Sequence, residues 1–355
     1  MTNRENFIRA IRRDNPEYVP LDFRLCPSQN DRFKEKTGSE DFMEYYNLPI
    51  RYVELNPTNK NYDFIPYYKG TLPADYAPLS WAKEWGIMGI AGMAHFQHMF
   101  HPLAQVDDIE ELKEFPMPDL DEDYRYEGVA ERIQQLKDQD IITVKHMKET
   151  IFEMAWYLRG MDNLMIDFFD DEDYANCLLD RLTQLRINSI RKITACGIDV
   201  IQLGDDIATQ LDMLMSPDQW REWLKPRMKA IIDAAKEVNP DVIIFYHSCG
   251  NIQRVIPDLI EIGIDVLNPI QPECMDVAEI KAKYGDQISF WGGLGTQTVM
   301  PFGTPEEVEA ECKRLIEVVG KGGGFVLSPS HVVEPEVTWE NLQAMIFAHK
   351  KYSKY

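Results

Sequence analysis

A histidine and a cysteine separated by one residue, His247 and Cys249, are the pair of side chains best suited to chemistry in this sequence. They follow residues 242–246, an apolar run of mostly β-branched and aromatic residues that is typical of a strand buried on both faces. Residues i and i+2 of an extended chain point the same way, so both groups can reach one site. Imidazole and thiolate together favour zinc among common metals. The pair predicts half of a metal site or half of an active site.

Two side chains do not hold a metal ion, so a third ligand has to come from another strand end. His331 follows the last apolar run, at 325–327, and is the candidate for this third ligand. Three protein ligands with one open position are the pattern of catalytic zinc. The alternative is that His247 hydrogen-bonds to substrate or backbone, while Cys249 is a small buried residue. The spacing alone leaves both interpretations open.

The elements that would position these residues form a regular series from residue 141 onward. Apolar runs alternate with helical segments, and two earlier runs bring the expected strands to eight. A strict alternation of strand and helix predicts parallel strands, and eight such units predict an α/β fold of the (β/α)8 TIM barrel type. A doubly wound open sheet is the alternative, but no Gly-x-Gly-x-x-Gly opens a helix after a strand. The expected strands are 18–24, 50–55, 141–145, 199–203, 242–246, 265–267, 288–291 and 325–327, and the expected helices are 149–160, 172–195, 217–238, 252–262, 276–283, 305–319 and 338–350.

Residues 56–140 do not follow this rhythm and are rich in Tyr, Pro and Trp. A long insertion in a compact domain is usually functional. We therefore expect a single domain over 1–355, with an aromatic-rich excursion at about 56–140 that caps the barrel mouth.

The active site of such a barrel lies at the C-terminal ends of its strands. Asp205 and Asp206 follow one strand and are adjacent, so their side chains point to different sides. We expect one of them to have a catalytic or ligand role and the other to cap the following helix or pair with an arginine. The residues expected to bind substrate at the other strand ends are Arg24, Glu54, His146, Asn268 and Trp291.

Composition limits the partners and the compartment. The net charge of −22 argues against nucleic acids and anionic membranes. No apolar run approaches the roughly 20 residues that span a bilayer. Six scattered cysteines are typical of reduced thiols, so we expect a cytoplasmic protein.

Several motifs together resemble the uroporphyrinogen decarboxylase superfamily, (β/α)8 proteins that also include zinc-dependent methyltransferases working with corrinoids. The resemblance is specific over about 140–355 and looser before it. The motifs are Gly-Asp-Asp at 204–206, Ser-Pro-x-x-Trp at 216–220, Tyr-His-Ser-Cys-Gly-Asn at 246–251, Trp-Gly-Gly at 291–293 and Gly-Gly-Phe-Val-Leu-Ser-Pro-Ser-His at 323–331.

Two branches of this superfamily compete. True decarboxylases carry an Arg-Gln-Ala-Gly-Arg-Tyr segment after the first strand, whereas residues 23–28 here contain one arginine, Arg24. Corrinoid-dependent methyltransferases bind zinc through a His-x-Cys pair and a later cysteine. His247 and Cys249 match the pair, and His331 stands where the cysteine would be. The resemblance is closer to the methyltransferase branch.

The resemblance implies a methyltransferase that moves a methyl group between a small methylated or methoxylated compound, or a thiol, and a corrinoid protein. Zinc would be held by His247, Cys249 and His331. The methylcorrinoid would be carried by a partner, because this sequence lacks the Asp-x-His-x-x-Gly motif of corrinoid-binding domains. The family also suggests a homodimer. The alternatives are a metal-independent decarboxylase, in which Arg24 and His331 bind substrate carboxylates, and a non-catalytic binding protein for a corrinoid partner.

Overall fold

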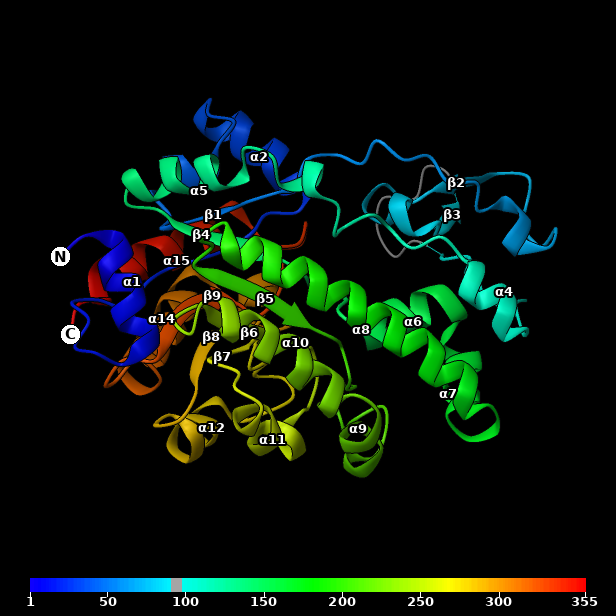
Figure 1. The fold of residues 1–355 in the computed structure, drawn as a ribbon. Coiled ribbons are helices and arrows are strands. Elements are labelled where there is room, and N and C mark those ends of the chain that lie inside the picture. The colour runs from blue at the N-terminus through cyan, green and yellow to red at the C-terminus, as the bar shows by residue number, and fades with distance from the viewer. Residues whose placement is uncertain (91–97) are drawn as a thin grey trace.

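A parallel, strongly curled sheet surrounded by helices forms the centre of the computed structural model, which describes residues 1–90 and 98–355 (Figure 1). Neighbouring strands follow one another in chain order, and each pair is parallel. The predicted α/β fold of the barrel type is therefore confirmed. The strands in spatial order are β1 (Ile50–Tyr52), β4 (Ile142–His146), β5 (Val200–Gly204), β6 (Ile243–His247), β7 (Val266–Asn268), β8 (Ser289–Leu294) and β9 (Phe325–Pro329).

The predicted first strand, 18–24, is wrong as a regular strand, although it lies where the barrel needs its eighth position. Leu21 forms an isolated parallel bridge with Leu327 of β9, and Leu25 forms another with Val333. Pro20 has no N–H to donate, which interrupts a regular ladder. The segment thus completes the wall beside β9 through separate bridges.

The register of the strands brings polar residues to one end of the sheet. Gly204 of β5 pairs with His247 of β6, and His247 pairs with Asn268 of β7. At the opposite end, Phe7 of α1 packs edge-on against Trp291 with ring centroids 5.3 Å apart. The N-terminal helix therefore contributes to the barrel interior, and the polar strand ends form the mouth.

The helices cover the outside of the sheet. The predicted helix 217–238 is divided at Leu224, because Pro226 occupies the first turn of the second half and cannot donate an N–H to the turn before it. The helices are α1 (Asn3–Arg12), α2 (Pro27–Thr37), α3 (Phe42–Tyr45), α5 (Val129–Asp138), α6 (Phe152–Arg159), α7 (Met161–Asp170), α8 (Glu172–Ala195), α9 (Pro217–Trp223), α10 (Lys225–Val238), η4 (Gln253–Val255), α11 (Ile256–Glu261), α12 (Val277–Tyr284), α13 (Val299–Phe302), α14 (Pro305–Val318) and α15 (Trp339–Tyr352).

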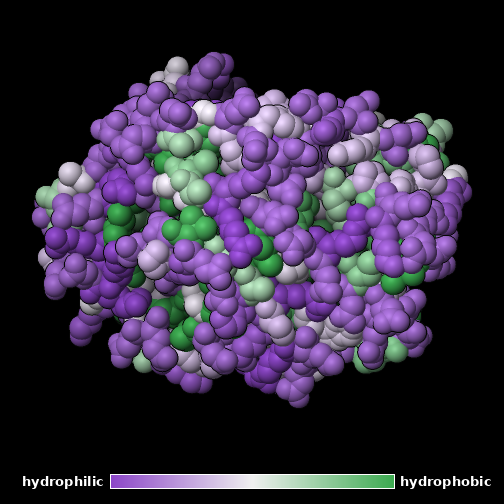
Figure 2. All heavy atoms as spheres, viewed as in Figure 1, coloured by the Kyte–Doolittle hydropathy of each residue, from purple (hydrophilic) through white to green (hydrophobic). Residues whose placement is uncertain are grey.

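The face of the molecule that includes α8 and α10 is largely hydrophilic, with hydrophobic residues in small separate patches (Figure 2). The buried residues of α8, such as Leu178 and Leu182, recur at the spacing of one helical face. The apolar faces of these helices are therefore turned inward. Among the described residues, no helix is long and apolar enough to cross a membrane.

The predicted excursion lies to one side of the barrel (Figure 1). It carries an antiparallel hairpin and short helices, and the hydroxyl of Tyr68 joins two of its segments by donating to the Gly86 carbonyl at 2.6 Å. Helix α5 packs against β4, so the irregular part ends before residue 129. Residues 91–97 lie outside the described chain. The elements of the excursion are η1 (Ile65–Tyr68), β2 (Tyr76–Pro78), η2 (Ser80–Trp85), β3 (Met88–Ile90), α4 (Ile109–Glu114) and η3 (Asp123–Tyr126).

Candidate active site and metal centre

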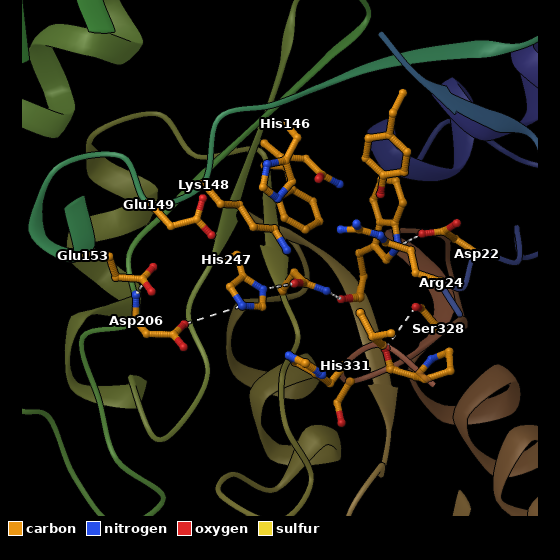
Figure 3. Close-up of a pocket in the computed structure, with 18 of the residues that line it drawn as sticks. Asp22, Arg24, His146, Lys148, Glu149, Glu153, Asp206, His247, Ser328 and His331 are labelled. Atoms are coloured by element: carbon orange, nitrogen blue, oxygen red, sulfur yellow. Dashed lines mark hydrogen bonds and ion pairs between the residues drawn. The ribbon is translucent and has the colours of Figure 1, made fainter. Parts of the chain in front are cut away.

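A cavity of about 290 Å³ opens at the C-terminal ends of the strands (Figure 3). Its walls come from the first extended segment, from residues within or directly after β1, β4, β5, β6, β7, β8 and β9, and from α6. The structure thus brings together most of the predicted site residues. Those that line the cavity are Arg24, His146, Asp206, His247, Asn268, Trp291 and His331.

Asn268 fixes the orientation of the His247 ring. Its side-chain amide donates to the carbonyl oxygen of Trp291 at 2.6 Å, so its Oδ1 faces the Nδ1 of His247 at 2.5 Å. An amide oxygen only accepts hydrogen bonds, so Nδ1 of His247 carries the proton. The lone pair is therefore on Nε2, the nitrogen that points away from Asn268. A metal-binding histidine is normally held by such a partner on its other nitrogen.

Two further donor atoms surround that nitrogen. The Sγ of Cys249 and the Oδ1 of Asp206 each lie 3.5 Å from Nε2 of His247. Together the three ligand atoms lie within 4.8 Å of one another, a grouping that could hold a metal ion. One nitrogen, one sulfur and one carboxylate oxygen suit zinc, which takes all three ligand types in catalytic sites. The donor set therefore fits zinc.

The protonation of these groups agrees with a metal site. Burial, and after it the charge of Lys148, holds the pKa of His247 well below its usual value, so the imidazole is neutral. Burial, followed by the charge of Asp206, raises the pKa of Cys249. A bound cation reverses the second effect, because a coordinating thiol is deprotonated by the metal. Cys249 would therefore release a proton if it bound a metal ion.

His331 is not a member of this group. Its imidazole is half exposed, and its Nδ1 lies 3.5 Å from the Oε1 of Glu334. His331 lines the same cavity as His247, but the carboxylate of Asp206 is the third donor beside the His-x-Cys pair. The positions of the donor atoms therefore favour Asp206 as the third ligand, in place of the predicted His331.

Asp205 has a structural position, in contrast to its neighbour. Its Oδ1 accepts from the backbone N–H groups of Ile151 and Glu153, each at 3.0 Å, and so caps the start of α6. It is buried, and burial raises its pKa to about 7. Asp205 does not line the cavity. Asp206 thus faces the mouth, whereas Asp205 caps α6, a helix that precedes it in the chain, and not the following helix that was expected. A catalytic or ligand role for Asp206 stays a prediction.

Glu153 is a site residue that the sequence did not single out. Its Oε2 accepts from the backbone N–H of Asp206 at 2.9 Å, and its Oε1 accepts from the Tyr157 hydroxyl at 3.0 Å. Burial, and then the charges of Asp206 and Asp205, raise its pKa well above the usual value. The signal available was its place in the first turn of a helix expected directly after a strand.

Glu54 does not reach this cavity. Its carboxylate pairs with Lys145 at 2.8 Å and lines a second cavity between the mouth and the excursion. His146 borders both cavities, and burial followed by the charge of Lys148 lowers its pKa to about 2. A third cavity of about 790 Å³ is bordered by Cys249 and His331 on another side of the metal group. The side chains of Asp206, His247 and Cys249 thus lie between the first and the third cavity.

Trp291 forms the floor of the first cavity and is anchored by Asp22. Its indole N–H donates to Oδ2 of Asp22 at 3.1 Å, and both side chains are buried. Burial raises the pKa of Asp22 to about 6. The folded protein therefore binds this proton more tightly than the unfolded chain, and its free energy of unfolding falls as pH rises from about 4 to about 6.

We expect the Asp22→Asn variant to remove this dependence. The amide oxygen still accepts from Trp291, but no charge forms. A rise in pKa from about 4 to about 6 corresponds to roughly 3 kcal/mol of unfolding free energy, which wild type loses between pH 3.5 and pH 8 and the variant does not. The stability of the variant relative to wild type should therefore be higher at pH 8 than at pH 3.5 by up to roughly that amount. Urea unfolding at both pH values measures the gain. Asp170, an exposed aspartate on α7, provides the control: Asp170→Asn should gain nothing. An equal effect of Asp22→Asn at both pH values would contradict the argument.

The protein is a parallel α/β barrel with an Asp/His/Cys group at its strand ends that could hold a metal ion. A family model described as uroporphyrinogen decarboxylase (URO-D) matches residues 2–352. The chain belongs to this family of enzymes, which confirms the resemblance seen in the sequence.

Relatives and solved structures agree with the family and the fold. Uroporphyrinogen decarboxylase of Chlorobium limicola is 27% identical over 67% of this chain and 68% of its own. The corresponding protein of Chloroherpeton thalassium is 24% identical over 100% of this chain and 99% of its own. A solved structure described as a methyltransferase from Methanosarcina mazei covers 99% of both chains, with a TM-score of 0.71 and 18% identity. That likeness shows the fold.

Proposed function

We propose that this enzyme moves a methyl group between a small methylated or methoxylated compound and a corrinoid carried by a partner protein. Zinc would be held by Asp206, His247 and Cys249. The observation that carries the proposal is the unprotonated Nε2 of His247, which faces a thiol and a carboxylate at 3.5 Å each. A decarboxylase that works without metal has no need of this arrangement.

Zinc, when bound, supplies a Lewis acid that activates the atom carrying or receiving the methyl group. The chain's own residues prepare the site around it. Asn268 holds the His247 ring. Glu153, whose carboxyl group lies beside Asp206 and has a raised pKa, would give a proton to an oxygen or nitrogen that loses its methyl group. The enclosing walls of the first cavity suit a small compound.

Two reactants need access to one centre, and the cavities on two sides of the metal group support such a reaction. Asp206 and His247 border the smaller cavity, whereas Cys249 borders the larger one. We infer that the small compound occupies the first and that the corrinoid approaches from the second. The corrinoid partner itself remains a prediction.

Decarboxylation is the second candidate, favoured by the named relatives and by Arg24 in the cavity wall. A porphyrinogen bears up to eight carboxylates, and its binding calls for a cationic mouth. Here two cations, Arg24 and Lys148, face a larger number of carboxyl groups. Methyl transfer is therefore the better match. The carboxyl groups lining the cavity are Asp22, Glu149, Glu153 and Asp206.

The test begins with chelator-washed protein and its metal content before and after zinc is added. We expect about one zinc per chain and methyl transfer between cobalamin and methoxylated or methylated compounds, followed by the visible spectrum of cobalt. Removing zinc should slow transfer by at least about 100-fold, equivalent to roughly 3 kcal/mol of lost activation. Porphyrinogen decarboxylation by zinc-free protein, without any cobalamin change, would refute the proposal. Corrinoid-protein binding without any turnover would instead indicate the non-catalytic alternative.

A further inference from the structure

Lys148 is a cation without a partner in the first cavity. It lies in the turn after β4, and its Nζ lies 5.8 Å from the centroid of the Phe245 ring. Within residues 1–90 and 98–355, its Nζ forms no ion pair within 4.0 Å and no hydrogen bond. Burial, followed by the charge of Arg24, lowers the pKa of Lys148. Its ammonium group is thus placed where charge is costly and has no direct partner, although Glu149 and Asp206 oppose part of this cost from a greater distance.

Arg24 lies on the facing wall of the cavity and, unlike Lys148, is exposed. Its guanidinium is 5.2 Å from the centroid of the Tyr52 ring, and it has no carboxylate partner within ion-pair distance in the described part of the chain. Figure 3 shows that Arg24 and Lys148 extend into the cavity toward one another. Two like charges facing each other destabilise the empty cavity, and an anion between them removes this cost.

A shortage of acids does not explain these unpaired cations. The chain has 59 Asp and Glu residues against 37 Lys and Arg. Two other buried arginines are paired with carboxylates: Arg125 contacts Asp119 at 2.8 Å, and Arg159 contacts Asp167 at 2.8 Å. A third buried arginine, Arg186, donates to the backbone carbonyls of Thr150 and Glu149. The cavity thus keeps two cations available while partners are plentiful elsewhere.

We propose that Lys148 and Arg24 together bind the carboxylate or sulfonate of an aromatic substrate. This inference rests on the proposed function and specifies its methyl compound as a small aromatic monoanion. The aromatic part of the ligand is indicated by the rings of Tyr52, Phe245 and Trp291, which line the cavity beside the two cations. The anion would be held at this end, and the methyl-bearing group would extend toward Asp206 and His247.

Titration calorimetry on the zinc-loaded protein, without any corrinoid, tests this site. The probes are 3-methoxybenzoate, 3-methoxybenzenesulfonate and the neutral 3-methoxybenzamide. We expect at least one anion to bind, and its affinity to fall by about 10- to 100-fold in Lys148→Met, as for the loss of one charged hydrogen bond. The amide should bind weakly and equally to both proteins. The two anions distinguish a carboxylate from a sulfonate substrate.

A matched control is Lys281→Met. Lys281 is half-buried and donates to the Gly323 carbonyl at 2.7 Å, away from the cavity, so this variant should bind the anion like wild type. A thermal shift adds a second readout. Without ligand, Lys148→Met should unfold at a higher temperature than wild type, because an uncompensated charge has been removed. A structural lysine would give a lower temperature.

The proposal is overturned if neither anion binds wild type, if Lys148→Met binds them equally well, or if the amide binds as tightly as the anions. These outcomes are separate from the proposed function. Anion binding with no methyl transfer would support the anion site at Lys148 and Arg24 and contradict the proposed methyltransferase function. Methyl transfer from neutral compounds alone would support the methyltransferase proposal and contradict the anion site at Lys148 and Arg24.

Discussion

The Asp206→Asn variant is expected to bind zinc more than about 100-fold more weakly than wild type, because losing even an outer partner of a zinc ligand costs 10- to 100-fold. The substitution is nearly isosteric. The amide oxygen can still accept from the N–H of Cys249, which lies 2.8 Å from Oδ1 of Asp206, so the loop should keep its shape. What the variant loses is the negative charge beside Nε2 of His247. Competition with a chromophoric zinc chelator measures the affinity.

His331→Ala provides the comparison that decides between two ligand sets. The sequence predicted His331 as the third ligand, whereas the donor atoms gather around Asp206. We expect His331→Ala to keep its zinc affinity within a few-fold of wild type, since its imidazole contacts Glu334 instead. Loss of zinc in His331→Ala with retention in Asp206→Asn would reverse the assignment and restore the His331 site.

Much of the barrel could be predicted because its strands are apolar on both faces. Residues 242–246 are buried between the barrel interior and the surrounding helices, so they form a continuous apolar run, and in residues 200–203 only Gln202 interrupts such a run. Each strand from β4 to β9 overlaps its predicted range. The helix α2 was missed because only Gln29 and Phe33 of its residues are buried, which leaves no periodic pattern to detect.

The site was harder to predict because its members meet only in three dimensions. The His247 and Cys249 pair was visible through its spacing. Which of two adjacent aspartates faces the mouth depends on how α6 packs, since the N–H groups of that helix capture Asp205. The proposed role of Lys148 depends on its lack of an ion-pair partner within the described residues, and a sequence pattern cannot show that a partner is missing.

Asn268 was predicted to bind substrate, and it lines the cavity. Its contacts with His247 and Trp291 add a second expected role, which is to position His247 for the proposed zinc. We expect Asn268→Leu to weaken zinc binding by about 10- to 100-fold, because Nδ1 of His247 loses its acceptor and the ring loses its fixed tautomer. The carbonyl of Trp291 also loses its donor, which should cost about 1–3 kcal/mol of stability. Chelator competition and urea unfolding measure the two effects separately.

Asn268→Asp separates positioning from stability. A carboxylate at this position can still accept from Nδ1 of His247 but cannot donate to the Trp291 carbonyl, so stability should fall while zinc affinity stays near wild type. The matched control is Asn341→Leu, since Asn341 is equally buried and donates to the Met300 and Gly303 carbonyls. It should lose stability and keep its zinc affinity. If zinc affinity instead followed stability through all three variants, Asn268 would be a purely structural residue, and His247 would need no partner to present Nε2 to the metal.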